Sequence, residues 1–278
     1  MKKLLVFLFL FSIQIYSQTD LKFDKRFVQS EDHWVAFPAD SIGQYPFGFI
    51  YIDSQAGLTL DYSGTFKIDS NGKYIATKIG ISGTAKYRLQ PNNVLVSFIQ
   101  DQKLKELEVE KIPDWLKIYK GDEESIDRLY RWGYMYNGYN EIEKALTYLE
   151  KAEKKDPNYK GLQTELAFSY NALKKFDKAE IALNKALKQN PKDCYSLKEM
   201  AYTYRHMDKL DKSEMVYNKM KLDCTEKNYI QETAYNLAFR YYELKDKKNF
   251  EKWSVEARKW LSNNQYTKNL DALEKEFK

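Results

Sequence analysis

Two stretches of this sequence share one pattern and decide the fold of its second half. Residues 144–159 read KALTYLEKAEKKDPNY, and residues 178–193 read KAEIALNKALKQNPKD. Alanines and a proline recur in them at a spacing of 34 residues. Because the residue before proline is pushed out of the helical region, each stretch reads as a helix that ends at the same point. The chain therefore contains a helical unit that is written more than once.

The register of this unit extends over three copies. Each copy has the same order of large, small and aromatic positions. They are Leu129, Trp132, Gly133, Tyr136, Ala145, Leu149, Ala152 and Pro157, then Gln163, Leu166, Ala167, Tyr170, Ala179, Leu183, Ala186 and Pro191, then Leu197, Met200, Ala201, Tyr204, Ser213, Tyr217 and Met220. Short side chains let two helices approach closely, and the large ones fill the space beside them.

This pattern resembles the tetratricopeptide repeat family, whose unit has this length and this order of residues. The resemblance covers about residues 126–261. It implies pairs of antiparallel helices that stack into a solenoid, since one pair alone cannot bury its apolar face. The expected units are residues 126–159, 160–193, 194–227 and 228–262, followed by a capping helix over residues 266–278.

The fourth unit departs from the pattern. Leu237, Ala238 and Tyr241 repeat the signature of a first helix, but Phe250 and the residues after it come about three positions late. The run KDKK at 245–248 is interpreted as a lengthened turn between the two helices. In the capping helix, apolar residues recur at helical spacing with charged residues on the other face. These apolar residues are Leu270, Leu273 and Phe277.

The first half reads as strands and resembles no family. Seven of the eleven glycines lie between Gly43 and Gly83, and none follows Gly161. The fold class is therefore α+β multidomain, with an antiparallel β sandwich or partly closed barrel over residues 20–112 and a linker over 113–125. The candidate strands are HWVAF (33–37), FGFIYID (47–53), AGLTLD (56–61), GTFKI (64–68), KYIATKI (73–79), AKYRL (85–89), VLVSFI (94–99) and the alternating KELEVEKI (105–112).

Two turns in this half are predicted to close hairpins. Asn71–Gly72 follows GTFKI and supplies the backbone conformation that a tight turn needs. The run QPNN at 90–93 lies between AKYRL and VLVSFI in the same way. After the strands, Asp122 or Ser125 is expected to cap the first helix of the solenoid.

Aromatic residues are frequent in the predicted strands, at Trp34, Phe37, Tyr45, Phe47, Phe49 and Tyr51. At alternating strand positions such residues form a core or pair across strands. The alternative is that they line the interior of a barrel that holds an apolar ligand.

The N-terminus has the pattern of a secretory signal peptide over residues 1–17. Two lysines precede an apolar run from Leu4 to Phe11, and a more polar end with Ser17 follows. That run is too short to span a bilayer. A buried helix or a short signal anchor is the alternative. The pattern predicts bacterial export to the periplasm or the cell exterior, and no later segment reads as membrane-spanning.

Composition and motifs exclude several classes of function. The formal net charge is +5, and it falls to +3 without Lys2 and Lys3. This small excess is spread along helix faces and gives no case for nucleic acid. Metal-ligand spacings, nucleophile elbows and phosphate loops are missing from the sequence. The two histidines, His33 and His206, lie in different domains, so no catalytic residue, metal or cofactor is predicted.

The two cysteines are placed to form a disulfide. Cys194 begins the first helix of the third unit, and Cys224 ends its second helix. In an antiparallel helix pair these two points lie at the same end. An exported protein is in a compartment that permits disulfides, and closing this loop contributes about 3–4 kcal/mol. The alternative is two independent small buried residues.

The family resemblance also implies where a partner binds, because first helices line the inner, concave surface of such a solenoid. The positions offset from the packing signature form a column rich in aromatics. They are Asp127, Tyr130, Tyr134 and Asn137 in the first unit, Thr164, Phe168 and Asn171 in the second, Tyr195, Lys198, Tyr202 and Arg205 in the third, and Tyr235, Phe239 and Tyr242 in the fourth.

Tyrosine and arginine are typical interface residues. Asn137 and Asn171 are equivalent, and their amides are expected to bond a partner's backbone. The alternative is that some of the tyrosines pack against neighbouring helices or the β domain. The family's basic clamp for a C-terminal carboxylate is not evident, because only Lys198 and Arg205 in this column are basic.

The sequence therefore predicts an exported, non-catalytic scaffold that binds a protein or peptide partner of the cell envelope in the solenoid groove. The alternative is a protein that binds a small apolar ligand or a glycan in its β domain and uses the repeats for assembly. An enzyme with its site in the β domain is the third reading. The partner's identity and the oligomeric state do not follow from the sequence.

Overall fold

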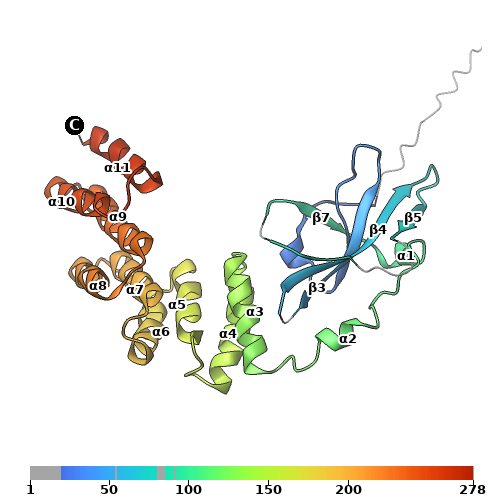
Figure 1. The fold of residues 1–278 in the computed structure, drawn as a ribbon, viewed down its shortest axis with the longest axis horizontal. Coiled ribbons are helices and arrows are strands. Elements are labelled where there is room, and N and C mark those ends of the chain that lie inside the picture. The colour runs from blue at the N-terminus through green and yellow to red at the C-terminus, as the bar shows by residue number, and fades with distance from the viewer. Residues whose placement is uncertain (1–19, 54, 80–84, 91, 278) are drawn as a thin grey trace, which may run out of the picture. The chain divides into compact units, whose positions relative to one another are not determined.

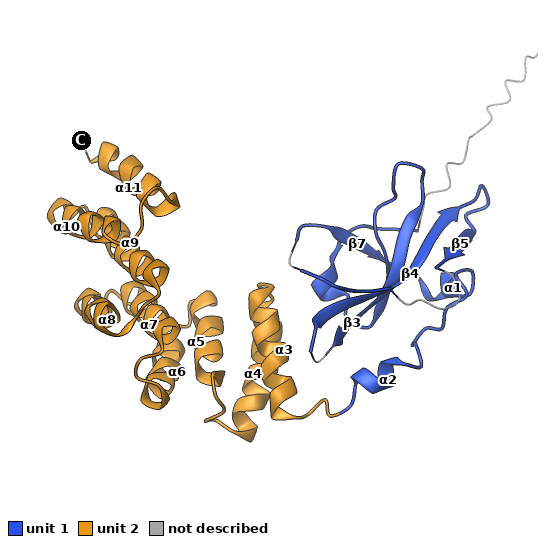
Figure 2. Cartoon of the chain, viewed as in Figure 1, with its two compact units in different colours: residues 1–121 blue, residues 122–278 orange. Residues whose placement is uncertain are grey.

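The computed structural model describes residues 20–53, 55–79, 85–90 and 92–277. The predicted signal peptide lies outside these residues. The chain divides into two compact units, residues 1–121 and 122–278 (Figure 2). Within the described part, none of the helices has the length and apolar character that crossing a membrane requires.

The first unit contains one seven-stranded antiparallel sheet (Figure 1). Its order is β1-β7-β2-β3-β4-β5, and β6 also pairs with β4. The strands are β1 Lys25–Arg26, β2 His33–Ala36, β3 Tyr45–Asp53, β4 Gly57–Ile68, β5 Tyr74–Lys78, β6 Ala85–Arg88 and β7 Leu95–Phe98. The short helices are η1 Phe27–Gln29, α1 Asp101–Leu104 and α2 Leu116–Tyr119.

Two of the expected strands form one long strand. AGLTLD and GTFKI are continuous in β4, whose pairing with β3 shifts register by one residue between Phe47 and Gly48. The predicted hairpin between β4 and β5 is confirmed, with Gly72 at a φ of 76° in its turn.

Two predictions for this unit are wrong. AKYRL and VLVSFI do not form a hairpin, because β6 pairs with β4 while β7 pairs with β1 and β2. The segment KELEVEKI is not a strand. It follows α1 as a turn, and its Leu107 is buried three residues after Leu104, the spacing of a helical turn rather than of a strand.

The aromatic residues of this unit pack against one another. Trp34 lies 5.3 Å from Phe49 and 6.2 Å from Phe47 between ring centroids, and both phenylalanines are fully buried. Trp115 also contacts Phe49, with the centroids 5.8 Å apart. Core packing is therefore the reading that the contacts favour. Residues around α2 belong to this unit, so part of the expected linker packs on the sheet.

The second unit is a series of antiparallel helix pairs with an added last helix, as the repeat predicted (Figure 1). Its helices are α3 Ile126–Gly138, α4 Ile142–Lys155, α5 Leu162–Ala172, α6 Phe176–Gln189, α7 Cys194–His206, α8 Leu210–Asp223, α9 Lys227–Glu243, α10 Lys247–Arg258 and α11 Gln265–Glu276. Ser125 caps α3 by accepting a hydrogen bond from the Arg128 N–H. The last helix packs on α9 and α10, as expected of a cap.

The lengthened turn expected in the fourth pair is wrong. Each turn has three residues, at 139–141, 173–175, 207–209 and 244–246. The extra residues lie instead in α9, which has 17 residues where α7 has 13. The sequence separation between Ala238 and Phe250 is therefore the same as that between Gly133 and Ala145, 12 residues in each case.

The small residues sit where the helices of a pair meet. A Cβ on Gly133 would lie 2.3 Å from the Cγ of Leu149, which is closer than atoms pack. Ala167 and Ala201, at the same register, are likewise buried. The predicted reason for short side chains at this position is therefore confirmed at Gly133.

Candidate functional site

The first helices of the pairs form one continuous side of the solenoid. Helix α3 contacts α5, α5 contacts α7, and α7 contacts α9. Each second helix packs on its own partner and on the first helix that follows it. These four helices, α3, α5, α7 and α9 (Figure 1), carry the residues that the sequence predicted to face a partner.

Aromatic side chains run along this side, as the sequence predicted. Tyr134 is the most exposed of them, at 59%. The others are partly buried, so each ring has one part against protein and another at the surface; they are Tyr130, Phe168, Tyr195, Tyr202, Tyr235, Phe239 and Tyr242. Burial alone thus leaves room for both packing and docking.

Several of these rings contact aromatic residues near the junction with the next helix pair. Tyr130 lies 5.1 Å from Tyr159 between centroids, and Tyr195 lies 5.9 Å from Tyr229. Gly161, with a φ of 82°, makes room for the first contact, because a Cβ there would lie 2.6 Å from the Tyr130 hydroxyl. These contacts hold the rings in fixed positions along the column.

Neighbouring rings also meet at the C-terminal end. Tyr235 lies 4.9 Å from Tyr266, a residue of α11. Tyr242 lies 5.0 Å from Phe277 and 6.3 Å from Phe239. The capping helix therefore adds its own aromatic residues to the column, which sequence reasoning did not include.

The expectation that Asn137 and Asn171 bond a partner is wrong. Both side chains are buried between successive helix pairs. The Asn137 amide donates to the Glu165 carboxylate at 2.9 Å and accepts from the Ser169 hydroxyl at 2.7 Å. The Asn171 amide makes the same two bonds to the next unit. Their donors and acceptors are used to join the units, because buried polar groups must be paired.

Other polar residues of the column are also engaged inside the protein. Thr164 is buried, with its hydroxyl 2.7 Å from that of Ser196. Arg205 is 9% exposed, and its guanidinium lies 3.5 Å from Glu243. Both are therefore poorly placed to meet a partner, unlike the rings beside them.

Lys198 lies deep in the column but reaches two carboxylates. Its ammonium is 3.1 Å from Glu199 and 3.7 Å from Glu232, and it lies over the Tyr195 ring at 4.7 Å. Its side chain is 15% exposed. Lys198 is thus a paired charge within a ring of aromatic and acidic groups.

The glutamates of this column were missed from the sequence. Burial raises the pKa of Glu165 to about 7, the Asn137 amide lowers it, and the charge of Glu199 raises it. Burial also raises the pKa of Glu232, against the effect of Lys198. Glu165 and Glu199 recur at the repeat spacing together with Asn137 and Asn171. This joint recurrence of an asparagine and a glutamate is the sequence pattern that could have indicated their contact.

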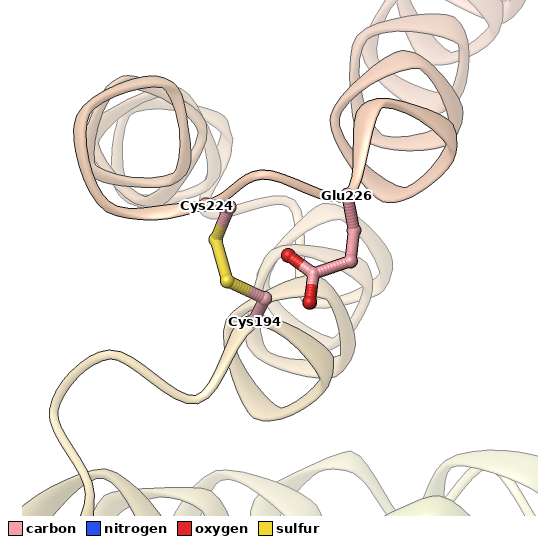
Figure 3. A group of neighbouring side chains, drawn as sticks. All are labelled: Cys194, Cys224 and Glu226. Atoms are coloured by element: carbon pink, nitrogen blue, oxygen red, sulfur yellow. A yellow bond between two sulfur atoms is a disulfide. The ribbon is translucent and has the colours of Figure 1, made fainter.

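Cys194 and Cys224 form a disulfide, as predicted (Figure 3). Their Cα atoms are 5.7 Å apart, at the start of α7 and just after α8. The Glu226 carboxylate lies within 4.8 Å of both sulfurs. Because the sulfurs are bonded to each other, they are not available as thiolate ligands for a metal.

The histidines do not meet. His33 stacks on Phe98 in the first unit, and His206 lies between Phe176 and Tyr202 in the second. Burial lowers the pKa of His206, and Arg205 lowers it further. Both histidine rings are therefore packed against aromatic side chains.

Comparison with known proteins supports the repeat. The family model described as tetratricopeptide repeat matches residues 138–200. No curated protein matches the sequence.

Solved structures with similar folds include two that overlap the chain broadly. The one described as a functional characterization of Pseudomonas aeruginosa pilF is 14% identical, covers 62% of this chain and 75% of its own, and has a TM-score of 0.44. The one described as MamA MSR-1 C2 is 15% identical, covers 63% and 89%, and has a TM-score of 0.41. At these scores neither supports an inference about function. The family match over residues 138–200 and the series of helix pairs together confirm the resemblance to the tetratricopeptide repeat family.

Proposed function

We propose that the protein is an exported, non-catalytic scaffold that binds a protein or peptide partner along α3, α5, α7 and α9. The observation that carries this proposal is the aromatic column. It continues over four helix pairs, and rings of the first, third and fourth pairs contact other aromatic rings while they remain partly exposed. Rings that are already ordered lose little conformational entropy when a partner covers them.

Affinity in this proposal comes from burial of the rings. Tyr130 and Tyr134 begin the column, with ring centroids 6.4 Å apart, and Tyr202 continues it on α7 in the third helix pair. Burial raises the pKa of Tyr130 to about 12, and a tyrosine hydroxyl is in any case a neutral donor at physiological pH. Tyrosine hydroxyls and the Lys198–Glu232 pair, rather than the asparagines, would then set the partner's register.

Export is supported by the N-terminal sequence pattern and by the disulfide. Disulfides persist in oxidising compartments such as the periplasm and are rare in the cytosol. The partner would accordingly be a component of the cell envelope. The alternative of an apolar ligand or glycan in the β domain gains no support, because the aromatic residues on which it depended pack on one another.

Photo-crosslinking in cells tests the proposal with a matched control. A photoreactive amino acid replaces Tyr134 on α3 in one variant and Ile181 on α6, a second helix, in the other. Both positions are 59% exposed in the native protein, so access to solvent is the same. We expect a discrete adduct from position 134 and none from position 181. Equal labelling from both positions, or none from 134, would refute docking on the first helices.

A further inference from the structure

A box of aromatic rings in the first unit holds the ammonium group of Lys86. The Lys86 Nζ lies 4.7 Å from the ring centroid of Tyr119, 4.8 Å from that of Trp115 and 5.4 Å from that of Tyr51. Rings attract a cation over their faces within about 6 Å. Three such rings around one nitrogen form an environment suited to an ammonium group.

The box is a fixed part of the fold. Tyr51 on β3 is fully buried, and its centroid lies 4.9 Å from that of Trp115 and 4.7 Å from that of Tyr119. Trp115 also packs edge-on against Phe49 in the sheet core. The walls are therefore held by the core and do not depend on Lys86 for their position.

A buried carboxylate lies next to the box. Asp61 on β4 is directly opposite Lys86 on β6 in the strand register, so both side chains are on the face of the sheet that carries Tyr51. Asp61 is 4% exposed, and its Oδ1 has no hydrogen-bond partner among the residues that the structure describes. A buried acceptor of this kind is costly, and it provides negative charge for a cation.

Lys86 reaches the box from outside. It lies on β6, which pairs with β4, and the residue is exposed. The ammonium donates to the Tyr119 hydroxyl at 2.9 Å. That bond engages one of its three N–H groups. A quaternary ammonium has no N–H to satisfy, so its whole surface can contact the same rings.

We propose that this box is a binding site for a ligand that carries a quaternary ammonium group, and that Lys86 fills it in the free protein. The ligand takes the place of the Lys86 ammonium among Tyr51, Trp115 and Tyr119, with Asp61 supplying the counter-charge. Lys86 swings out toward solvent. Because Lys86 is tethered beside the box, it competes at high effective concentration and weakens the binding of a free ligand.

Titration of the full chain with choline tests this proposal by NMR of the Trp115 indole N–H. The chain has five tryptophans, so a Trp115→Phe variant assigns the signal. For Lys86→Ala we expect a saturable shift with a dissociation constant on the order of 1 mM. Wild type should bind about 10-fold more weakly. Lys78→Ala, which removes a lysine from the neighbouring strand β5, should behave as wild type.

Two further comparisons separate recognition of the cation from general apolar binding. Neohexyl alcohol, in which carbon replaces the nitrogen of choline, should give no saturable shift. Lys86→Ala combined with Asp61→Asn should bind choline about 10-fold more weakly than Lys86→Ala alone. If Lys86→Ala does not fold, as judged by circular dichroism, Lys86→Gln replaces it.

The proposal is overturned if the folded Lys86 variant shows no saturable shift, binds neohexyl alcohol equally well, or is indifferent to Asp61→Asn. The source of the ligand follows from a second arm. Sedimentation of the Lys86 variant with phosphatidylcholine vesicles, but not with phosphatidylglycerol vesicles, would indicate a lipid headgroup. Choline binding without such sedimentation would indicate a free ligand.

Discussion

The carboxyl group of Glu165 is buried between the first two helix pairs of the solenoid. Its titration makes the stability of the fold depend on pH. Glu165 is 8% exposed, and its pKa rises from 4.5 to about 7 because of burial, opposed by Asn137 and reinforced by Glu199. The folded state therefore holds a proton that the unfolded state has lost between these pH values. The contribution of Glu165 to the free energy of unfolding is therefore fully present below pH 4.5 and is lost as the pH rises through 7.

Glu165→Gln should remove this loss, because glutamine keeps the shape of the protonated carboxyl. We expect the variant to exceed wild type in free energy of unfolding by about 1–3 kcal/mol near pH 8.5, and to differ little near pH 5. Urea unfolding at the two pH values measures the difference. A variant that is less stable than wild type at the higher pH would contradict the assignment.

Glu153 provides the control of opposite sign. Burial raises its pKa, but hydrogen bonds from Gln163 and Lys185 outweigh burial and lower it overall. Stability from this group is present above the unfolded pKa and disappears as the pH falls. Glu153→Gln should therefore reduce stability at neutral pH, and the reduction should shrink in acid.

The glycines of α3 test close packing one residue at a time. A Cβ at Gly133 would collide with Leu149, whereas a Cβ at Gly138 would meet nothing within 4 Å. Gly133→Ala should lower the free energy of unfolding by about 1–3 kcal/mol through overpacking. Gly138→Ala should raise it by up to about 1 kcal/mol, since alanine favours the helix. Chemical denaturation compares the two variants, and equal effects would show that α3 and α4 separate easily.

At the scale of elements, each helix pair turns through one residue in the left-handed conformation. These residues are Asn140, Lys174, Asp208 and Lys245, with φ between 57° and 59°. Asparagine and aspartate tolerate this conformation better than lysine does. The turns therefore have the same geometry in all four pairs but differ in backbone strain.

Lys174→Gly should relieve that strain and raise the free energy of unfolding by about 1 kcal/mol. The adjacent Lys175 has a φ of −89°, so Lys175→Gly relieves nothing and serves as the control. Thermal and urea unfolding of both variants provide the measurement. A gain in the control as large as that in Lys174→Gly would mean that the backbone conformation is not the cause.

The helical elements could be predicted because their signals are local. The small residues, the prolines and the apolar spacing of one pair lie within 34 residues and recur. The strands were harder, since partners are distant in the sequence. β6 and β7 are separated by a short run typical of a hairpin, yet each pairs elsewhere. KELEVEKI alternates like a strand, but burial of Leu104 and Leu107 in the core decides its conformation.

The same limit explains the fourth pair. The sequence showed that the fourth pair departs from the repeat by about three residues, but it did not show which element contains the extra residues. The structure places them in α9, with the turn after Glu243 unchanged. The added residues lie at the start of α9, where Tyr229 packs against Tyr195 and Ile230 is buried.

At the scale of the whole molecule, the sequence predicted which helices carry the aromatic column but not which of its polar residues are buried between helix pairs. The side of a helix follows from spacing, so the rings were placed correctly on the first helices. Whether a polar side chain points into the groove or into the junction depends on its neighbour in the next unit. Asn137 meets Glu165 there, and Asn171 meets Glu199. Only the pair, not either residue alone, reveals the contact.

The groove itself is tested by removing two rings at once. Tyr134 is 59% exposed, and Tyr202 is partly buried with its ring 4.3 Å from that of His206. Tyr134→Ala with Tyr202→Ala should weaken binding of the crosslinked partner at least about 10-fold, because aromatic anchors supply most interface energy. The melting temperature should fall by no more than about 4 °C, since neither ring is in the core.

The matching control lies on the second helices, at Ile181 and Met215, which are 59% and 70% exposed. Ile181→Ala with Met215→Ala removes a similar apolar area and should leave affinity unchanged. Calorimetry measures binding, and thermal unfolding measures stability in both variants. If the tyrosine variant instead loses much stability and keeps its affinity, the column holds the units together rather than a partner. If the control loses affinity too, the partner wraps both sides of the solenoid, and the first helices have no special part in recognition.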